Sequence, residues 1–559
     1  MKLKGAEIVI EALKKENVEV VFGYPGSAVI PIFHYLFNAP FKFVLPRHEQ
    51  GGVHAADGYA RASGKPGVVI ATSGPGATNL VTGIATANMD SIPLVIITGQ
   101  VARPMIGNDA FQEVDVSGVT RPISKHNYLV QDIKDLARTI KEAFHVAMTG
   151  RPGPVVVDIP VDITNETYEF DYPETVSLRG YKPTYKGHPN QIKKACAIIS
   201  NSKRPVIYAG GGVILSDASE ELAEFVKKTK IPITTTLLGL GAFPETDKLS
   251  LEMLGMYGTY YANQAVDKAD LVIAVGARFD DRVTGKIDSF SSSSKVIHID
   301  IDPTSVSKNI EAEIPIVGHC KSILAEMTKI VKAPEIDEWR SKLMELKEKH
   351  PFAYKDSDTV IKPQFVVESI YRLTKGEAII TTEVGQTQLW AAQFYKFTRP
   401  RTFISSGGFG TMGYGLPAAI GAQLAKPDKH VIDIAGDGSI QMNIQELIVA
   451  SEHKLPVIVA ILNNGYLGMV RQWQEMFWER RYSYTDISFA PDFVKLAEAY
   501  GAVGIKVTEK KEVEPAIKKA LSITDRPIIL DFHVAREENV FPFVPAGKTV
   551  DDTIMGETE

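Results

Sequence analysis

One unit recurs three times in the sequence and constrains the fold more than any other feature. Each copy has an apolar run, a glycine-rich turn, a helical pattern, and a second apolar run introduced by Ile-Pro or Leu-Pro. The runs that open the copies span 68–72, 205–209 and 430–435. Strands that alternate with helices form parallel sheets covered on both faces. The sequence therefore predicts an α/β protein built from doubly wound parallel sheets.

The three copies predict three α/β domains. We expect an N-terminal domain at 1–165, a central domain at 186–335 and a C-terminal domain at 361–540. The connector 165–189 is polar, with four Tyr and three Pro, and is interpreted as a strap on the surface. The tail 541–559 is rich in Pro, Gly and acidic residues. That composition favours a mobile segment, although the tail could also fold over a site.

Composition narrows the class of protein. The 559 residues carry a net charge of −6, with 61 basic and 67 acidic side chains, so no nucleic-acid or anionic-membrane partner is indicated. No apolar run approaches the roughly 20 residues of a membrane helix, and the N-terminus has an amphipathic helix pattern rather than a signal peptide. Cys196 and Cys320 are far apart, which indicates free thiols in a reducing compartment. We expect a cytoplasmic enzyme or binding protein.

The third copy places two oxygen-bearing side chains at one edge of its sheet. The strand at 430–435 ends in Gly436-Asp437-Gly438, and the strand at 457–462 ends in Asn463-Asn464-Gly465. Because the carboxyl ends of parallel strands share an edge, Asp437 and Asn464 should face one crevice. Carboxylate and amide oxygens suit Mg²⁺ that also binds a diphosphate, and the glycines let backbone N–H groups approach phosphate. Each turn alone could be an ordinary loop, but the pair around one strand–helix–strand unit favours a ligand site.

This arrangement resembles the thiamine-diphosphate motif of the pyruvate-decarboxylase-like enzymes. The resemblance implies that Asp437, Asn464 and the main-chain carbonyl of Tyr466 hold Mg²⁺. It also places Gly436, Asp437, Gly438 and Ser439 at the cofactor diphosphate.

Longer motifs make the resemblance specific. RHEQGGVHAADGYARASG, ATSGPGATNLVTGIA, GARFDDRVTGK, SSGGFGTMGYGLPAAIGA and MVRQWQ look like acetohydroxyacid synthase catalytic subunits, and the match runs almost end to end. The resemblance implies thiamine diphosphate, Mg²⁺ and FAD as cofactors. It implies that pyruvate is decarboxylated and condensed with pyruvate or 2-ketobutyrate. The products would be 2-acetolactate or 2-aceto-2-hydroxybutyrate, which lead to valine, leucine and isoleucine.

Glu49 stands at a strand-to-helix junction, after the apolar run 41–45 and before a helical pattern at 53–62. A glutamate there often only matches the helix dipole. The resemblance instead implies that Glu49 bonds N1′ of the aminopyrimidine, so that the cofactor can lose its C2 proton. It also implies that the first and third domains of different subunits face each other. A homodimer or a dimer of dimers is therefore expected, and the resemblance implies a small regulatory subunit as a further partner.

Five more residues receive roles from the resemblance. Phe111 lines the substrate pocket, Gln112 lies near the thiazolium, and Met412 bends the cofactor. Trp473 narrows the acceptor pocket and favours 2-ketobutyrate, while Arg282 holds the carboxylate of the second 2-keto acid. Without the resemblance, Phe111 would be an aromatic plug in a loop, Met412 and Trp473 core side chains, and Arg282 part of a surface ion pair.

The central domain carries a candidate FAD site. Its glycine triplet is weak evidence alone, but an acid at a strand end suits ribose hydroxyls, and Arg278 suits a phosphate unless it only pairs with Asp280. The resemblance implies FAD binding there, without net redox work. The expected residues are Gly210, Gly211, Gly212, Met256, Gly276, Arg278, Asp280, Arg282, Asp300 and Ile301. Val384, Gly385, Gln386 and Met412 are expected at the thiamine diphosphate.

Five positions depart from the family pattern. Val161 stands where many members have Lys, Tyr257 and Thr387 where His is usual, Ser27 where Gly is usual, and Ala102 where Pro is usual. They leave substrate preference and inhibitor response open.

Two rival functions stay open at this point. One is a flavin oxidoreductase that resembles pyruvate oxidase, which shares the cofactor set. The other is a non-catalytic, cofactor-binding regulatory protein. Intact Glu49, Asp437 and Asn464 argue against the second rival, because a silent site has no need of all three.

Overall fold

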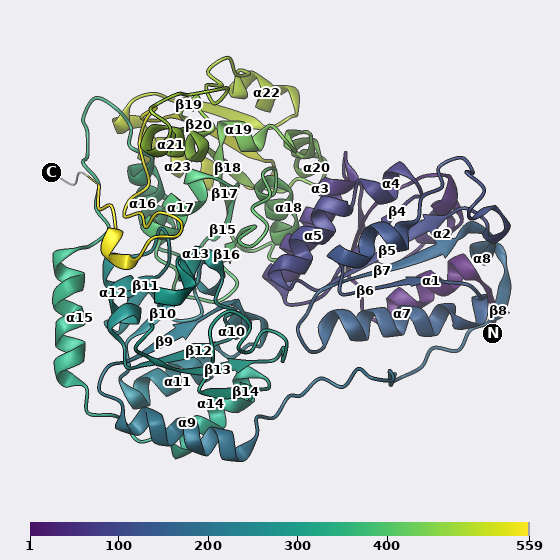
Figure 1. Ribbon diagram of the computed structural model, residues 1–559. Coiled ribbons are helices and arrows are strands. Elements are labelled where there is room, and N and C mark those ends of the chain that lie inside the picture. The colour runs from purple at the N-terminus through teal and green to yellow at the C-terminus, as the bar shows by residue number, and fades with distance from the viewer. Residues whose placement is uncertain (557–559) are drawn as a thin grey trace.

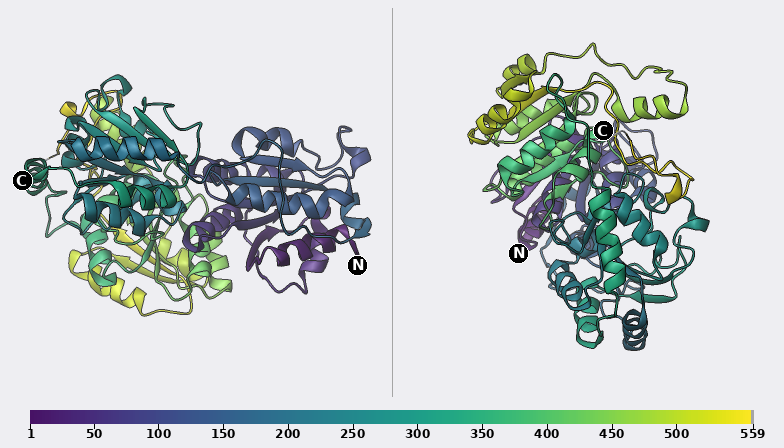
Figure 2. Two further views of the ribbon diagram at one scale, coloured as in Figure 1. Left: turned by 90° about the horizontal axis from the view of Figure 1, so that it is seen from below. Right: turned by 90° about the vertical axis from the view of Figure 1, so that its left-hand side faces the viewer.

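The computed structural model describes residues 1–556 and contains three six-stranded sheets, each entirely parallel (Figure 1). Helices cover both faces of each sheet, so the predicted fold class is confirmed. The N-terminal domain forms the lobe on the right of Figure 1, and the other two domains form the larger lobe on the left. The second view of the molecule, in the left panel of Figure 2, shows the same two lobes.

The N-terminal sheet has the strand order β3-β2-β4-β5-β7-β6. In that order its strands are Lys42–Val44, Val20–Tyr24, Gly67–Ala71, Leu94–Gln100, Pro154–Pro160 and His126–Leu129. The helices are α1 (Gly5–Lys15), α2 (Ile30–Leu36), α3 (Glu49–Ser63), α4 (Pro75–Thr78), α5 (Val81–Asp90), α6 (Val116–Thr120), α7 (Ile133–Met148) and α8 (Val161–Asn165). Strands β4, β5 and β7 are buried along their whole length, as a sheet covered on both faces requires. Outside this sheet, β1 (Lys2–Lys4) pairs antiparallel with β8 (Thr167–Glu169).

The central sheet has the strand order β11-β10-β9-β12-β13-β14. In that order its strands are Ser250–Met253, Ile233–Thr235, Pro205–Ala209, Leu271–Val275, Lys295–Asp300 and Ile314–Val317. The helices are α9 (Pro189–Asn201), α10 (Gly211–Leu215), α11 (Ser219–Thr229), α12 (Tyr260–Lys268), α13 (Asp281–Thr284), α14 (Cys320–Ile330) and α15 (Asp337–Lys349).

The C-terminal sheet has the strand order β16-β15-β17-β18-β20-β19. In that order its strands are Phe403–Ile404, Ile379–Thr382, Val431–Gly436, Ile458–Asn463, Ile528–His533 and Val503–Val507. The helices are α16 (Pro363–Thr374), α17 (Gln386–Phe394), α18 (Gly415–Ala425), α19 (Asp437–Ile440), α20 (Leu447–Glu452), α21 (Gly468–Phe477), α22 (Phe493–Ala499) and α23 (Lys510–Leu521). The segment after β17 differs from the expected turn followed by a helix at 444–452. A one-turn helix, α19, already begins at Asp437, and a 3-10 turn at Ile444–Glu446 precedes α20.

Helices α3 and α18 join the N-terminal and C-terminal domains of the same chain. They cross so closely that a Cβ atom added to Gly58 would lie 2.1 Å from the Ala418 carbonyl oxygen. A Cβ atom on Gly421 would lie 1.8 Å from the Ala55 carbonyl oxygen. Glycine at both positions therefore allows the two backbones to touch, which fixes the contact between the domains.

The connector and the tail both lie against the folded domains. The connector runs from the N-terminal lobe to α9 along the lower edge of Figure 1, and its Tyr181 hydroxyl accepts a hydrogen bond from Lys125 Nζ (2.9 Å). The tail differs from the expected mobile segment. Phe543 is 1% exposed and stacks on Tyr257, and Val544 N donates to the Met256 carbonyl (2.8 Å), because the tail's apolar side chains find a buried surface. The last part of the expected tail, 557–559, lies outside the described residues.

Within residues 1–556, none of the helices has both the length and the apolar character needed to cross a membrane.

Candidate functional site

A cavity of about 550 Å³ opens where the three domains meet. This volume lies within the usual range of small-molecule sites. Thirteen of the site residues expected from the sequence line it: Gly210, Gly211, Gly212, Met256, Gly276, Arg278, Asp280, Arg282, Asp300, Ile301, Val384, Gly385 and Trp473. The structure therefore brings together in one space the residues expected at FAD, two of those expected at the thiamine diphosphate and the tryptophan expected at the acceptor pocket.

The glycines of the central domain have a packing role as well as a place in the cavity wall. Gly212 N donates to the Gly276 carbonyl (3.0 Å), and a Cβ atom on Gly212 would lie 2.7 Å from Gly276 Cα. Gly276 also has a φ of +58°, in the left-handed region. The two loops that end β9 and β12 can touch only because glycine stands in both.

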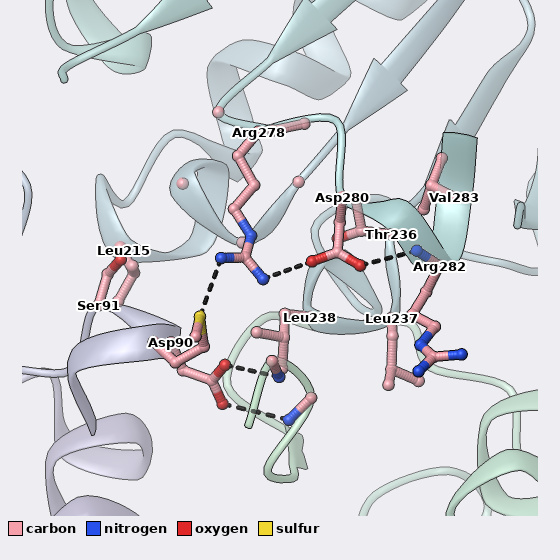
Figure 3. A pocket seen from close by; sticks show the side chains of 18 of the residues that line it. Asp90, Ser91, Leu215, Thr236, Leu237, Leu238, Arg278, Asp280, Arg282 and Val283 are labelled. Carbon is pink, nitrogen blue, oxygen red and sulfur yellow. Dashed lines mark hydrogen bonds and ion pairs between the residues drawn. The ribbon is translucent and has the colours of Figure 1, made fainter. Parts of the chain in front are cut away.

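Arg278 and Asp280 form an ion pair at the cavity wall, shown in Figure 3. The Asp280 carboxylate also accepts from the backbone N–H of Arg282 (3.0 Å), and Arg278 Nη1 lies 3.1 Å from Met89 Sδ. The Arg282 guanidinium lies 3.7 Å from Asp281 and 6.0 Å from the centre of the Trp473 ring. The simple ion pairs considered for these arginines are thus present, and both arginines also line the cavity.

Asp300 supplies the acidic group at the end of β13. One of its oxygens accepts from Asp302 N (2.9 Å), and burial raises the pKa of the Asp300 carboxyl to about 6. A carboxyl group in this position suits ribose hydroxyls, and the guanidinium of Arg278 suits a phosphate. The cavity's volume and donor set fit an adenosine-containing group such as FAD.

Asp90 is a cavity residue that the sequence analysis missed. It ends α5, and its carboxylate accepts from Gly408 N (2.8 Å) and Gly407 N (3.2 Å), as Figure 3 shows. Arg61 Nη2 pairs with the same carboxylate at 2.9 Å. Nothing in the local sequence distinguishes this aspartate from an ordinary helix-terminal residue, because Gly407 and Gly408 lie more than 300 positions away along the chain and Arg61 lies 29 positions before it.

Asp437 and Asn464 meet at the edge of the C-terminal sheet, as the strand ends indicated. Gly436 pairs with Leu462 across β17 and β18, and Asp437 Oδ2 accepts from Gly465 N (3.0 Å). Asn464 Oδ1 accepts from Tyr466 N (3.0 Å). Both side chains are buried, and burial raises the pKa of the Asp437 carboxyl to about 6. Carboxylate and amide oxygens are the ligand type that Mg²⁺ prefers, so the chemistry of this edge fits a magnesium diphosphate group.

Glu383 organises the loops around this edge and was also missed. Its carboxylate accepts from Gly413 N (2.8 Å), Gly415 N (3.0 Å) and the Ser439 hydroxyl (2.6 Å). Burial raises the pKa of this carboxyl. The available signal was an acidic residue directly after the buried strand β15, next to the expected loop at 384–386.

The loop at 384–386 and the glycine-dense loop at 407–413 leave room for a ligand. Gly385 has a φ of +133°, and no atom of the described residues lies within 4 Å of the position that its Cβ would occupy. Gln386 turns away from this space and contacts Asn464 and Gln472 through its side chain. Met412 is half-buried beside the Glu383 network.

Glu49 begins α3 and lies in a second group of expected residues, outside the cavity lining. Its Oε2 accepts from Asn79 Nδ2 (2.9 Å). Gln112 has a left-handed φ of +60° and lies against the Gly74–Gly76 loop. Its Cα atom is 2.9 Å from the position that a Cβ atom added to Gly74 would occupy. Phe111 is 84% exposed, so it is no buried plug in this chain.

Glu446 fixes the turn that leads into Glu49. Its carboxylate accepts from Arg47 N (3.0 Å to each oxygen) and His48 N (2.9 Å), although these residues belong to another domain. Burial raises the pKa of the Glu446 carboxyl to about 7. The segment that starts at Asp437 therefore contacts the turn that carries Glu49, a link that the sequence analysis did not find.

Three sequence families match this chain in succession. Residues 3–119 match the thiamine pyrophosphate enzyme N-terminal TPP binding domain, residues 192–327 the central domain, and residues 383–532 the C-terminal TPP binding domain.

Among curated proteins, the chain is similar to acetolactate synthases from several organisms. It is 47% identical to the acetolactate synthase large subunit of Haemophilus influenzae, over 100% of this chain and 99% of the relative. It is 48% identical to the acetolactate synthase isozyme 3 large subunit of Escherichia coli, over 100% and 99%. It is also 48% identical to the large subunit of Corynebacterium glutamicum, over 99% and 90%.

Proposed function

Because the chain belongs to the acetolactate synthase large-subunit family of thiamine pyrophosphate enzymes, we propose that it makes acetohydroxy acids for branched-chain amino-acid biosynthesis. It is a thiamine-diphosphate-dependent transferase that decarboxylates pyruvate and joins the remaining two-carbon unit to a second 2-keto acid. Two pyruvates give 2-acetolactate and CO₂. The observation that carries this conclusion is the 47–48% identity to acetolactate synthase large subunits, which extends over at least 99% of the chain.

The C-terminal edge is proposed to hold the cofactor diphosphate. When bound, thiamine diphosphate supplies the electron sink for decarboxylation and for carbon–carbon bond formation. Asp437, Asn464 and the Tyr466 carbonyl would hold Mg²⁺, and the open space before Gly385 would admit a phosphate. The contact between the Asp437 and Asn464 loops and the burial of both side chains support this assignment.

The cavity among the three domains is proposed to hold FAD. Arg278 would bind its phosphates and Asp300 its ribose, while Gly210 and Gly276 would let the backbone approach. The volume and the acidic strand end support the assignment. In this proposal FAD has a structural role.

Glu49 and Gln112 are proposed to complete the catalytic site of a second subunit in a homodimer or a dimer of dimers. Within the described residues, Glu49 Oε1 makes no hydrogen bond, so it is free to bind the aminopyrimidine. The 84% exposure of Phe111 supports a partner surface beside this group. A small regulatory subunit is proposed because the relatives are named large subunits. A cytoplasmic location stays a prediction, supported by two buried, free cysteines.

We assign the acceptor pocket to the end of the cavity at Trp473. Arg282 would bind the carboxylate of the second 2-keto acid. The position of the Trp473 ring would set the width of the acceptor pocket and thereby the choice between pyruvate and 2-ketobutyrate. The Arg282 guanidinium carbon lies 6.0 Å from the centre of the Trp473 ring, which supports this pairing.

The test uses purified protein with thiamine diphosphate, Mg²⁺, FAD and pyruvate. Acetolactate should form with one CO₂ per product. Asp437→Asn should bind the cofactor at least about tenfold more weakly in the presence of Mg²⁺.

The acceptor is tested by adding 2-ketobutyrate in competition with pyruvate. Trp473→Leu should lower the share of six-carbon product, whereas Trp478→Leu, at an exposed position after the same helix, should not. Acetaldehyde as the sole product would refute the synthase. Flavin reduction at the rate of turnover would favour the oxidoreductase.

A further inference from the structure

We propose that Tyr257 is a positioning residue that sets the acceptor preference by holding the indole of Trp473 in one orientation. This inference rests on the proposed function, in which Trp473 borders the acceptor pocket. Tyr257, Met469 and Trp473 all line the cavity.

The Tyr257 hydroxyl bridges two side chains on one face of α21. Trp473 Nε1 donates to the hydroxyl oxygen (3.0 Å), and the hydroxyl lies 3.0 Å from Met469 Sδ, to which it donates. Met469 and Trp473 are four residues apart, so they lie one turn apart on the same side of the helix. An indole has one N–H and no acceptor, so this single bond decides how the ring is turned about its side-chain torsions.

Tyr257 can hold the indole because it is itself fixed on several sides. It is 8% exposed, and its ring stacks on Phe543 of the tail with centroids 4.9 Å apart. Its carbonyl accepts from Gln393 Nε2 (2.9 Å). Burial raises the pKa of the phenol to about 12, so the hydroxyl keeps its proton and both accepts and donates near neutral pH. The bond therefore transmits a rigid position to Trp473.

The orientation of the indole also affects the charged group of the pocket. The Arg282 guanidinium carbon lies 6.0 Å from the centre of the Trp473 ring, a cation–π distance, and its side chain is 57% exposed. If the ring turned, this partly exposed guanidinium would lose that neighbour, and the space beside it would vary in width. Loss of the Tyr257 hydroxyl should therefore alter the choice between acceptors more than the turnover of pyruvate alone.

The experiment combines Tyr257→Phe and Trp473→Phe singly and together, with fixed pyruvate and rising 2-ketobutyrate. Tyr257→Phe keeps the ring stacked on Phe543 and removes only the hydroxyl. We expect the six-carbon to five-carbon product ratio to change roughly three- to tenfold, with a larger change in KM for 2-ketobutyrate than in kcat. In the Trp473→Phe background, Tyr257→Phe should cause no further change in the ratio.

Tyr395→Phe is the matched control. Tyr395 is also a buried tyrosine whose hydroxyl is hydrogen-bonded, to Thr374 Oγ1 at 3.2 Å, but it does not line the cavity. Its removal should leave the product ratio unchanged. A second readout is the fluorescence of Trp473. It is obtained by subtracting the emission spectrum of a protein that carries Trp473→Phe from that of the same protein without this substitution. Tyr257→Phe should shift this component to longer wavelength, because the freed N–H turns towards water.

Two results of the competition assay would overturn the inference. One is an unchanged product ratio in Tyr257→Phe when the wild type makes both products. The other is an equal change in the Trp473→Phe background, which would show that Tyr257 acts without the indole. A wild type that forms no six-carbon product would refute the proposed acceptor instead. In that case the Trp473 fluorescence tests whether Tyr257 positions the indole, and a spectrum that Tyr257→Phe leaves unchanged overturns the inference.

Discussion

Glu446→Ala removes the acceptor that holds the turn before Glu49. The two backbone amides concerned, Arg47 N and His48 N, lie 2.9–3.0 Å from the carboxylate oxygens. Glu446 is 2% exposed, so water has little access to replace it. An unmatched buried amide costs about 1–3 kcal/mol. Near neutral pH the raised pKa leaves the Glu446 carboxyl partly protonated, and a protonated carboxyl is a weaker hydrogen-bond acceptor. We therefore expect a cost for each amide in the lower part of this range. The turn should lose about 2–4 kcal/mol of local stability.

Hydrogen exchange measured by mass spectrometry reports on these two amides directly. A loss of 2–4 kcal/mol corresponds to exchange that is roughly thirty-fold to several hundredfold faster in a peptide covering 44–52. Glu446→Gln keeps one carbonyl oxygen as an acceptor and should fall between the wild type and Glu446→Ala. The buried strand β9 at 205–209 is the internal control, and its exchange should not change.

The rate of catalysis should fall as the turn loses its protection from hydrogen exchange, because Glu49 directly follows the turn. Acetolactate formation by the three proteins should therefore rank in the same order as their exchange protection. Unchanged exchange at 44–52 in folded Glu446→Ala would refute the reasoning, since the carboxylate would then not hold the turn. Faster exchange at 205–209 as well would indicate general unfolding, and it would contradict a local role.

Two more substitutions test contacts between domains. Burial raises the pKa of Glu245 to about 8, so between about 4.5 and 8 the folded chain keeps a proton that the unfolded chain has lost. Because of this group, the free energy of unfolding falls by up to about 5 kcal/mol as the pH rises through that window. Glu245→Gln, which keeps an acceptor for Phe397 N, should melt above the wild type at pH 9 and lose that advantage at pH 5. For Gly421→Ala, the new Cβ would lie 1.8 Å from the Ala55 carbonyl, so we expect a loss of about 3 kcal/mol, and an unchanged melting temperature would contradict the close crossing of α3 and α18.

Local sequence signals predicted the elements that local forces define. The strand expected at 205–209 begins and ends where the structure has it, and the strands expected at 68–72, 430–435 and 457–462 are each displaced by one residue. In each case an apolar pattern is bounded by residues that break it. The meeting of Asp437 and Asn464 also followed from the sequence, because parallel strands align their carboxyl ends. The catalytic and cofactor roles of these residues stay predictions.

Contacts between distant segments could not be read from the sequence. Glu446 is 399 residues from Arg47, and Asp90 is 318 residues from Gly408. The residues around each of these acids are those of an ordinary helix, so the sequence gives no sign of the backbone amides that the packing of domains brings to it. The tail illustrates the same limit, since its composition favoured mobility while Phe543 packs on the aromatic ring of Tyr257.

The crossing of α3 and α18 has a consequence for how the chain is made. Helix α3 ends at Ser63, and α18 begins at Gly415, roughly 350 residues later. At a synthesis rate of about 5–20 residues per second, helix α3 is complete about 20–70 s before α18 begins to be made. During that interval the Gly58 face of α3 is uncovered on the nascent chain. A chaperone that binds apolar helices early in translation should therefore associate with this face and be released once residues 415–425 have emerged.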